Sequence, residues 1–329
     1  MITRETMSQR FSPSMVCADC RTPIVAEQLT CPKCGWSARK GSHFVEWLSS
    51  KDRSSADFAD YVLTYDTLAD RFLTRSHEAM SYVESLAAGC VTQLPPLLGK
   101  AVCDVGSGRG YFIKHALAAG AASVTAVDVA SPALATVTEE HSVDGYLANA
   151  ENLPFDRSFD VLVATDIVEH VLNVPNFLVS ANWALKDDGI LLVRVPYLED
   201  MMGYSNFFGL PMHFTHLRTY DRTLLVHDLE TAGYKIEKIY FDGFRADYPA
   251  RFWNRFPSFK ARLQKWLEGR YGLDNVKGLP EWLARLLMKP IEIGAVARKI
   301  KHIEPIRYHD DLREFHDQRK AKSTQGAGS

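Results

Sequence analysis

A carboxylate-led glycine turn is the feature of this 329-residue chain with the clearest chemical meaning. The segment 104–110 reads D-V-G-S-G-R-G and directly follows the apolar run 101–103. Its glycines allow a sharp turn and a close ligand, and a helix expected at 111–119 points its N-terminus at that ligand. A second apolar run, 124–127, ends at Asp128, whose carboxylate can hold two ribose hydroxyls. The two segments predict a nucleotide-type pocket at the carboxyl edge of a parallel sheet.

Two classes of cofactor use this geometry. A dinucleotide site prefers G-x-G-x-x-G, and its third glycine would fall on Tyr111. The leading Asp104 would repel a pyrophosphate, but it suits a ligand that carries an ammonium and a sulfonium. The turn therefore favours S-adenosylmethionine (SAM), with another ligand on a Rossmann-like sheet as the alternative.

Further motifs follow this turn in a fixed order. They are N-A-E-N-L-P-F at 149–155, S-F-D-V-L-V-A-T at 158–165, D-I-V-E-H-V at 166–171, L-K-D-D-G-I-L-L-V at 185–193, and H-L-R-T-Y with a later A-G-Y at 216–234. Together with the turn they resemble the class I SAM-dependent methyltransferases of the type 11 and type 12 subfamilies. The resemblance covers roughly residues 61–298.

The resemblance implies an α/β fold built on a Rossmann-like, seven-stranded sheet. This sheet is mostly parallel, its last strand is antiparallel, and helices cover both faces. Strands are expected near 101–105, 123–128, 144–148, 159–165, 189–195, 234–241 and 291–296. The implied SAM contacts come from the turn, the strand ends, the adenine loop and a helix before the core: Tyr65, Asp104, Gly106, Ser107, Gly108, Gly110, Asp128, Val129, Asn149, Ala150, Glu151 and Thr165.

Two positions depart from the family pattern. Asn149 replaces the usual aspartate of the adenine loop, although its amide oxygen can still accept a hydrogen bond from adenine N6. Asp188 replaces the first glycine of the turn before the fifth strand. Tyr65 is also open to two interpretations, a cap over the methionine end of SAM or a residue of helix packing.

Four cysteines form a second chemical pattern. Two C-x-x-C pairs at short separation are typical of a zinc ribbon whose four thiolates leave no open coordination position. The ligands would be Cys17, Cys20, Cys31 and Cys34. The metal should therefore be structural, and a unit this small has too little core to fold without it. Two disulfides are the alternative, which a reducing compartment disfavours.

Candidate catalytic residues follow the fourth and fifth strands. Methyl transfer to a hydroxyl requires removal of its proton as it attacks, so a histidine or carboxylate near the methyl group is expected. His213 and His216 lie in an aromatic loop that resembles a substrate cover, and His170 follows the fourth strand. His170 has the alternative role of bracing its loop, and Asp166 that of capping a helix. Arg194 is interpreted as binding an anionic substrate group or pairing at the surface.

The acceptor is predicted less sharply than the donor. No N/D-P-P-Y motif follows the fourth strand, which argues against methylation of adenine N6. We expect transfer to an oxygen, or secondarily a nitrogen, of a small molecule, a glycan or a lipid-linked saccharide. An RNA methyltransferase is the second hypothesis, and a non-catalytic SAM-binding protein is the third.

The chain divides into segments of different character. We predict a disordered start (1–14), the ribbon (15–40), a helical segment (41–100), the SAM-binding core (101–300) with a helical insert (242–290), and an extension (301–329) with a disordered end. From Arg245 onward there are 18 basic and 10 acidic residues, whereas the remainder has 20 basic and 30 acidic residues. This basic region predicts either a solvated helical appendage or contact with an anionic partner.

The insert and the first residues of the chain indicate where in the cell the protein is expected. Aromatic and basic residues alternate along 251–267, which predicts packing on the sheet or a lid, and secondarily contact with a membrane surface. No apolar stretch is long enough to span a membrane, and residues 1–14 lack an apolar signal region. We therefore expect a cytoplasmic protein. The sequence does not indicate its oligomeric state.

Overall fold

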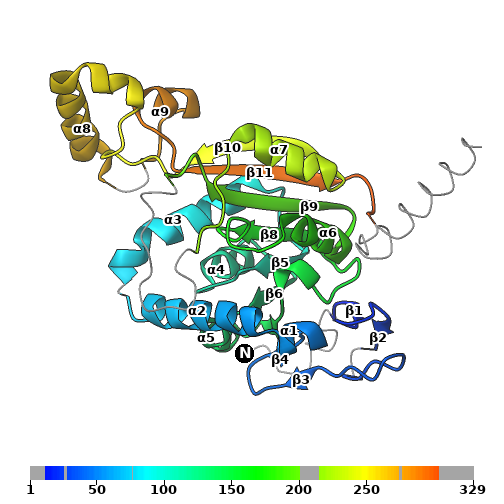
Figure 1. Cartoon of the computed structure of the whole chain (residues 1–329). Helices are drawn as coiled ribbons and strands as arrows, with labels where there is room; N and C mark the ends of the chain where they lie inside the picture. The colour runs from blue at the N-terminus through cyan, green and yellow to red at the C-terminus, as the bar shows by residue number, and fades with distance from the viewer. Residues whose placement is uncertain (1–11, 26–27, 76, 201–214, 274–275, 304–329) are drawn as a thin grey trace, which may run out of the picture.

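The computed structural model describes residues 12–25, 28–75, 77–200, 215–273 and 276–303 (Figure 1). The predicted disordered start, 1–14, lies outside these residues except for 12–14, and the predicted disordered end of the extension 301–329 lies wholly outside them. Within the described residues, no helix is both long enough and apolar enough to cross a membrane.

One mixed sheet forms the centre of the molecule. Its order in the described residues is β10-β11-β9-β8-β5-β6-β7-β4-β3. The core strands are β5 (Ala101–Val105), β6 (Ser123–Asp128), β7 (Asp144–Leu147), β8 (Phe159–Thr165), β9 (Leu185–Pro196), β10 (Tyr234–Asp242) and β11 (Glu292–Lys299). Strands β7, β6, β5, β8 and β9 are parallel, whereas β11 is antiparallel to both β9 and β10. The predicted mostly parallel sheet with an antiparallel last strand is confirmed.

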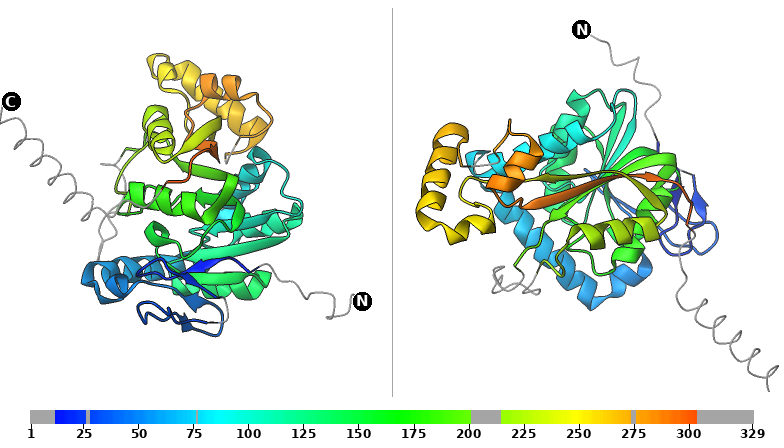
Figure 2. Two further views of the ribbon diagram at one scale, coloured as in Figure 1. Left: turned by 90° about the vertical axis from the view of Figure 1, so that its right-hand side faces the viewer. Right: turned by 90° about the horizontal axis from the view of Figure 1, so that it is seen from above.

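The central strands are buried because helices cover both faces. One face carries α2 (Ala56–Leu73), α3 (His77–Gln93), α4 (Tyr111–Ala118) and α5 (Ser131–His141), and the other carries α6 (Val174–Ala184) and α7 (Arg222–Thr231) (Figure 2). Every residue of β5 is buried, as expected for a parallel strand covered on two sides. Asn173 and Asp221 cap α6 and α7 through their side chains, so both helices begin where the sequence supplies a capping residue.

The N-terminal part extends this sheet. Strands β1 (Met15–Val16) and β2 (Pro23–Ile24) form a small antiparallel pair, and β3 (Arg39–Lys40) pairs with β4 (Val45–Glu46). Strand β4 also pairs in parallel with β7. The prediction of seven strands is therefore two short, because strands of two residues carry no alternating pattern to detect. We call residues 12–48 the cysteine segment; the predicted domain boundaries remain predictions.

The insert forms a helical lobe, residues 243–290, beyond the β10–β11 end of the sheet and opposite the cysteine segment (Figures 1 and 2). It contains the 3-10 turn η3 (Arg251–Arg255), α8 (Pro257–Tyr271) and α9 (Glu281–Leu287) around its own hydrophobic cluster. Leu263 and Leu267 are buried there, but Phe252, Phe256, Phe259 and Trp266 are 48–57% exposed. Packing of these aromatic side chains on the sheet was therefore a wrong prediction, because the lobe's own cluster takes only one side of α8.

Candidate functional site

The glycine turn adopts a backbone that its sequence requires. Gly106, Gly108 and Gly110 all have positive φ angles, of 74°, 49° and 72°. The amides of Gly106 and Ser107 both donate to the carbonyl of Val127, which fixes the turn against β6. A Cβ on Gly106 would lie 2.9 Å from Cδ1 of Ile167, so the turn also needs glycine for space.

Two carboxylates flank this turn. Asp104 lies in β5 and is 2% exposed; burial and the nearby Asp128 raise its pKa to about 8. Asp128 ends β6, and its two oxygens accept the amides of Gly108 and Ala130 at 2.9 Å each. Burial raises the pKa of Asp128 as well, although these amides favour its charged form. A cationic ligand would satisfy both carboxylates.

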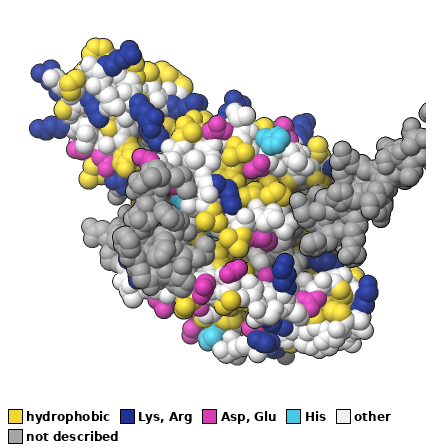
Figure 3. All heavy atoms as spheres, in the orientation of Figure 1, with side chains coloured by type: hydrophobic (Ala, Val, Ile, Leu, Met, Phe, Trp, Pro, Cys, Tyr) yellow, Lys and Arg dark blue, Asp and Glu magenta, His cyan; other side chains and the backbone are white. Residues whose placement is uncertain are grey.

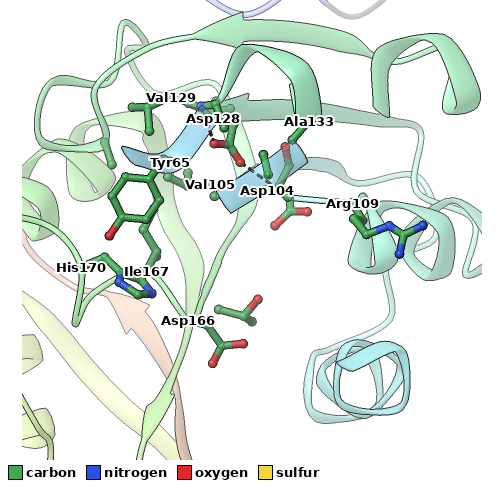
Figure 4. A pocket seen from close by; sticks show the side chains of 18 of the residues that line it. Tyr65, Asp104, Val105, Arg109, Asp128, Val129, Ala133, Asp166, Ile167 and His170 are labelled. Carbon is green, nitrogen blue, oxygen red and sulfur yellow. Dashed lines mark hydrogen bonds between the residues drawn. The ribbon is translucent and has the colours of Figure 1, made fainter. Parts of the chain in front are cut away.

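A cavity of about 350 Å³ opens at this edge of the sheet (Figure 4). Its wall includes most of the residues predicted to contact SAM: Tyr65, Asp104, Gly106, Ser107, Gly108, Asp128, Val129, Asn149, Ala150 and Thr165. The predicted catalytic residues Asp166, His170 and His216 line the same cavity. The structure thus joins the predicted donor site and acceptor site in one space.

Two predicted SAM contacts are not brought to the cavity wall. Gly110 is the N-cap of α4, and a Cβ there would lie 3.0 Å from the ring of His141 and 3.1 Å from Val137. Its role is close packing of α4 against α5. Glu151 turns to the start of α6, where it accepts the amide of Asn173 at 3.0 Å.

The adenine loop is held from the N-terminal side. Asn149 accepts the amide of Glu151 at 3.0 Å and donates to Asp52 at 3.1 Å, so part of its hydrogen-bonding capacity serves the loop itself. Asp52 belongs to α1 (Ser50–Ser54). No sequence pattern indicates that this carboxylate lies beside Asn149, because 97 residues separate the two.

An ion pair between the buried Arg194 and the partly exposed Asp166 lines the cavity. Arg194 is 1% exposed and pairs with Asp166, so its predicted surface pairing was wrong. It lines the cavity, and binding of a substrate anion stays a prediction. Burial disfavours its charge, but Asp166, Cys90 and Glu292 raise its pKa on balance. Asp166 has a φ of 55° and no helix-capping bond to a backbone amide in this structure. It serves the pair with Arg194 instead of capping a helix.

Two histidines meet at the cavity wall: His170 comes from the turn after β8, and His216 from the segment before α7. Their ring centroids are 4.6 Å apart. Nδ1 of His170 lies 2.8 Å from the carbonyl oxygen of Thr215, and Nδ1 of His216 lies 2.6 Å from Oε2 of Glu199. Burial, together with His216, lowers the pKa of His170 to about 4, so this imidazole is neutral at pH 7. His213 lies outside the described residues.

Sequence reasoning missed two acids beside these histidines. Glu169 is 1% exposed, and Glu199 reaches His216 across 17 residues. The sequence could have indicated Glu169, because it directly precedes His170 inside the D-I-V-E-H-V motif. No sequence pattern could have indicated Glu199, since its position depends on how the chain returns after β9.

The four cysteines come together as predicted. One sulfur atom from each of Cys17, Cys20, Cys31 and Cys34 lies within 4.8 Å of the others. The sulfurs of Cys17 and Cys34, and those of Cys20 and Cys31, are 3.6 Å apart, and none of these cysteines forms a disulfide. Four converging thiols at this spacing fit a tetrahedral zinc ion.

Comparison with known proteins agrees with this geometry. The sequence model of the methyltransferase domain matches residues 75–239. The chain belongs to the methyltransferase domain family. This confirms the methyltransferase class expected from the sequence, and the fold gains support from a solved structure of a SAM-dependent methyltransferase of Thermotoga maritima. That structure is 18% identical, has a TM-score of 0.50, and is matched over 73% of this chain and 99% of its own.

Curated relatives match this chain over only part of their own length. A Mycolicibacterium smegmatis protein named "Probable S-adenosylmethionine-dependent methyltransferase" is 28% identical over 170 residues, 51% of this chain and 61% of that protein. A ubiquinone biosynthesis O-methyltransferase of Rickettsia conorii is 31% identical over 97 residues, 28% of this chain and 33% of its own. A tRNA U34 carboxymethyltransferase of Marinobacter nauticus is 29% identical, over 40% of this chain and 45% of its own. The chain therefore spans less than two thirds of each of these relatives.

Proposed function

We propose that the protein transfers the methyl group of SAM to an oxygen of a small molecule, a glycan or a lipid-linked saccharide, and secondarily to a nitrogen. One observation carries this proposal: the histidine pair, His170 and His216, lines the same cavity as Asp104 and Asp128. The finer placement among the type 11 and type 12 enzymes rests on the sequence motifs.

The donor half of the cavity supplies complementary charge. Asp104 would face the ammonium and sulfonium of SAM, and Asp128 would accept the ribose hydroxyls. Asn149 and Ala150 would border the adenine. Because the sulfonium already activates the methyl carbon, these residues chiefly hold the donor in line with the acceptor.

The acceptor half must activate a hydroxyl. The acceptor oxygen forms a bond to the methyl carbon, the carbon–sulfur bond breaks, and its electron pair returns to sulfur to give S-adenosylhomocysteine (SAH). The hydroxyl proton has to leave during this displacement. Neutral His170 and its neighbour His216 place imidazole groups at this end of the cavity, with Asp166 beside them.

The cysteine cluster would hold a structural zinc ion. Its four thiolates would complete the tetrahedron, so the zinc would supply fold stability and no open position for chemistry. This segment contacts the adenine loop: the amide of Val16 donates to Pro154, and Arg21 donates to the carbonyl of Leu153 at 2.7 Å. The zinc would thereby stabilise the cofactor site from outside.

The helical lobe supports an acceptor presented at a membrane surface. Basic and apolar side chains gather on it in Figure 3, and Trp266 and Trp282 are 53% and 68% exposed. Segment 251–287 contains eight basic and three acidic residues. Exposed aromatic side chains among basic ones fit the interface of an anionic bilayer. Because SAM is made and used in the cytoplasm, the membrane face contacted would be the cytoplasmic one.

Methylation of RNA is the second candidate. The partial similarity to a tRNA carboxymethyltransferase and the basic lobe favour it. The cysteine segment argues against it, because Arg21 is committed to internal contacts with Asn152, Leu153 and Trp183.

Labelled methyl transfer into a cell extract tests the function. Protein and SAM with a radioactive methyl group are incubated with extract, with and without ribonuclease, and the products are divided into lipid, aqueous and RNA fractions. We expect label in the lipid or aqueous fraction, unaffected by ribonuclease and lost in Asp128→Ala. Label that disappears after ribonuclease would establish the RNA alternative, and no label in any fraction, although SAH binds, would contradict methyl transfer.

A further inference from the structure

Three potential metal ligands converge at the acceptor end of the cavity. One donor atom from each of Glu169, His170 and His216 lies within 4.8 Å of the others. Nε2 of His170 is 3.8 Å from Oε1 of Glu169. The two histidines line the cavity, and Figure 4 shows His170 beside Tyr65 and Ile167. The cluster is separate from the four cysteines.

The carboxylate of this cluster is buried without compensation. Glu169 is 1% exposed, and among the described residues neither of its carboxylate oxygens has a hydrogen-bond partner. The nearby cations are engaged elsewhere: Arg194 pairs with Asp166, and Arg218 donates to the carbonyl oxygens of Val168 and Val171. A buried carboxylate without a partner is costly, so this one requires a proton or a cation.

Both histidines are oriented in the manner of metal ligands. Nδ1 of His170 faces the carbonyl oxygen of Thr215, and Nδ1 of His216 faces the carboxylate of Glu199. An imidazole whose Nδ1–H donates to an oxygen has its tautomer fixed, and its Nε2 then carries the lone pair that binds a metal. One carbonyl and one carboxylate in these outer positions are the partners usually found behind metal-binding histidines.

We infer that Glu169, His170 and His216 bind one divalent transition-metal ion that activates the methyl acceptor. Two imidazoles and one carboxylate favour Zn²⁺, Mn²⁺, Fe²⁺ or Co²⁺ over Mg²⁺ and Ca²⁺, and three protein ligands leave positions open to the acceptor. This inference rests on the proposed function. The cation binds the acceptor hydroxyl and lowers its pKa, its proton passes to solvent, and the oxygen then displaces SAH from the methyl carbon.

Metal titration of the zinc-loaded protein tests this site without measuring activity. Protein that retains one equivalent of zinc is saturated with SAH and divided into separate samples. One is titrated with Co²⁺ and monitored by visible absorption and calorimetry, and the other is titrated with Mn²⁺ and monitored by electron paramagnetic resonance. We expect one further equivalent of each metal. His170→Ala and Glu169→Gln should each weaken Co²⁺ binding at least about tenfold, and Glu199→Gln should weaken it by about 10–100-fold as an outer partner.

The matched control is His227→Ala, which removes an exposed histidine of α7. It should leave the titration unchanged, and SAH binding by each variant shows that it is folded. If Glu169→Gln does not fold, Glu199→Gln provides the test, because Glu199 is only half-buried. Failure to take up a second metal while SAH binds normally would overturn the inference and leave the proposed function standing. Uptake of the second metal without any SAH binding would instead overturn the proposed function.

Discussion

The two appendages of this methyltransferase attach to its core in opposite ways. The cysteine segment joins the sheet by pairing β4 with β7, and it bonds to the adenine loop through Val16, Ala18 and Arg21. The helical lobe has its own hydrophobic cluster and leaves Trp266 and Trp282 exposed. One appendage is built into the cofactor site, whereas the other presents a surface.

This difference separates stability from recognition. Trp36 and Trp47 lie 5.2 Å apart in the cysteine segment, and each donates its indole N–H to a backbone carbonyl, of Leu48 and Val16 respectively. These buried contacts hold the cysteine segment together, and the amide of Val16 in turn donates to Pro154 of the adenine loop. The lobe contributes no residue to the wall of the described cavity. Changes in the cysteine segment should therefore affect SAM, and changes on the lobe should affect partners.

Loss of the ribbon zinc should give the largest effect. Cys17→Ser removes a buried ligand and should release the zinc, because structural zinc supplies much of the folding energy of such a unit. Loosening several loop contacts at a combined cost of about 2 kcal/mol would weaken SAH binding about thirtyfold. Calorimetry with SAH and a zinc assay measure both changes. Lys33→Ser, an exposed change between two ligands, is the control.

Equal SAH affinity in Cys17→Ser and Lys33→Ser would contradict the structural coupling between the two sites. The cysteine segment would then have no role in SAM binding, although the description of the cavity itself would be unaffected.

The pH should change the affinity for SAM through Asp104 of the core, and not through either appendage. Asp104 has a pKa of about 8 without ligand and is therefore mostly protonated at pH 7. The SAM ammonium favours the carboxylate, so binding releases a proton, and affinity should rise roughly tenfold from pH 6 to pH 7. Calorimetry at several pH values measures this slope. Asp104→Asn should flatten it, and an equal slope in that variant would assign the effect to another group.

Arg21→Ala should have a smaller effect than loss of zinc. It removes the hydrogen bonds to Asn152 and Leu153 but keeps all four cysteines. A net loss of about 1 kcal/mol corresponds to roughly fivefold weaker SAH binding, with the zinc content unchanged. Arg39→Ala, at an exposed ion pair with Glu46, is the control. If both variants bind SAH like the unmodified protein, Arg21 does not transmit the support of the cysteine segment.

Changes on the lobe should leave SAM binding almost unaltered. The double variant Trp266→Ser and Trp282→Ser should change SAH affinity less than about twofold and the free energy of unfolding by at most about 0.5 kcal/mol. It should reduce co-sedimentation with vesicles containing phosphatidylglycerol. Leu98→Ser, an exposed residue outside the lobe, is the control. Unchanged vesicle binding in the double variant would remove the membrane role from the lobe.

The sequence predicted the parts of the fold that local patterns encode. The strands β5, β6 and β8 begin and end at the expected residues, because continuous apolar runs between turns define buried parallel strands. The turn before the fifth strand also tolerates its departure from the family, since Asp188 adopts a φ of 60° in place of glycine. Strands β3 and β4 were missed because the pairing of β3 with β4 and of β4 with β7, rather than their composition, makes them strands.

The site was predictable where one motif carries several residues. Asp104 and Gly106 come from a single turn, whereas the surroundings of His216 depend on chain segments far apart in sequence. Glu199 reaches that histidine, and Arg194 turns inward to Asp166, only through the tertiary arrangement of β8 and β9. Charge pairing between distant strands leaves no periodic trace in a sequence.

Calorimetric titration with SAH, the product form of the donor, is the most direct test of the central claim that the carboxylate-flanked turn binds an S-adenosyl cofactor. Zinc-loaded protein should bind one equivalent of SAH, Asp128→Ala should lose at least about tenfold in affinity, and NAD should give no heat of binding. Stoichiometric binding of NAD in place of SAH, or SAH affinity unchanged in Asp128→Ala, would contradict the account.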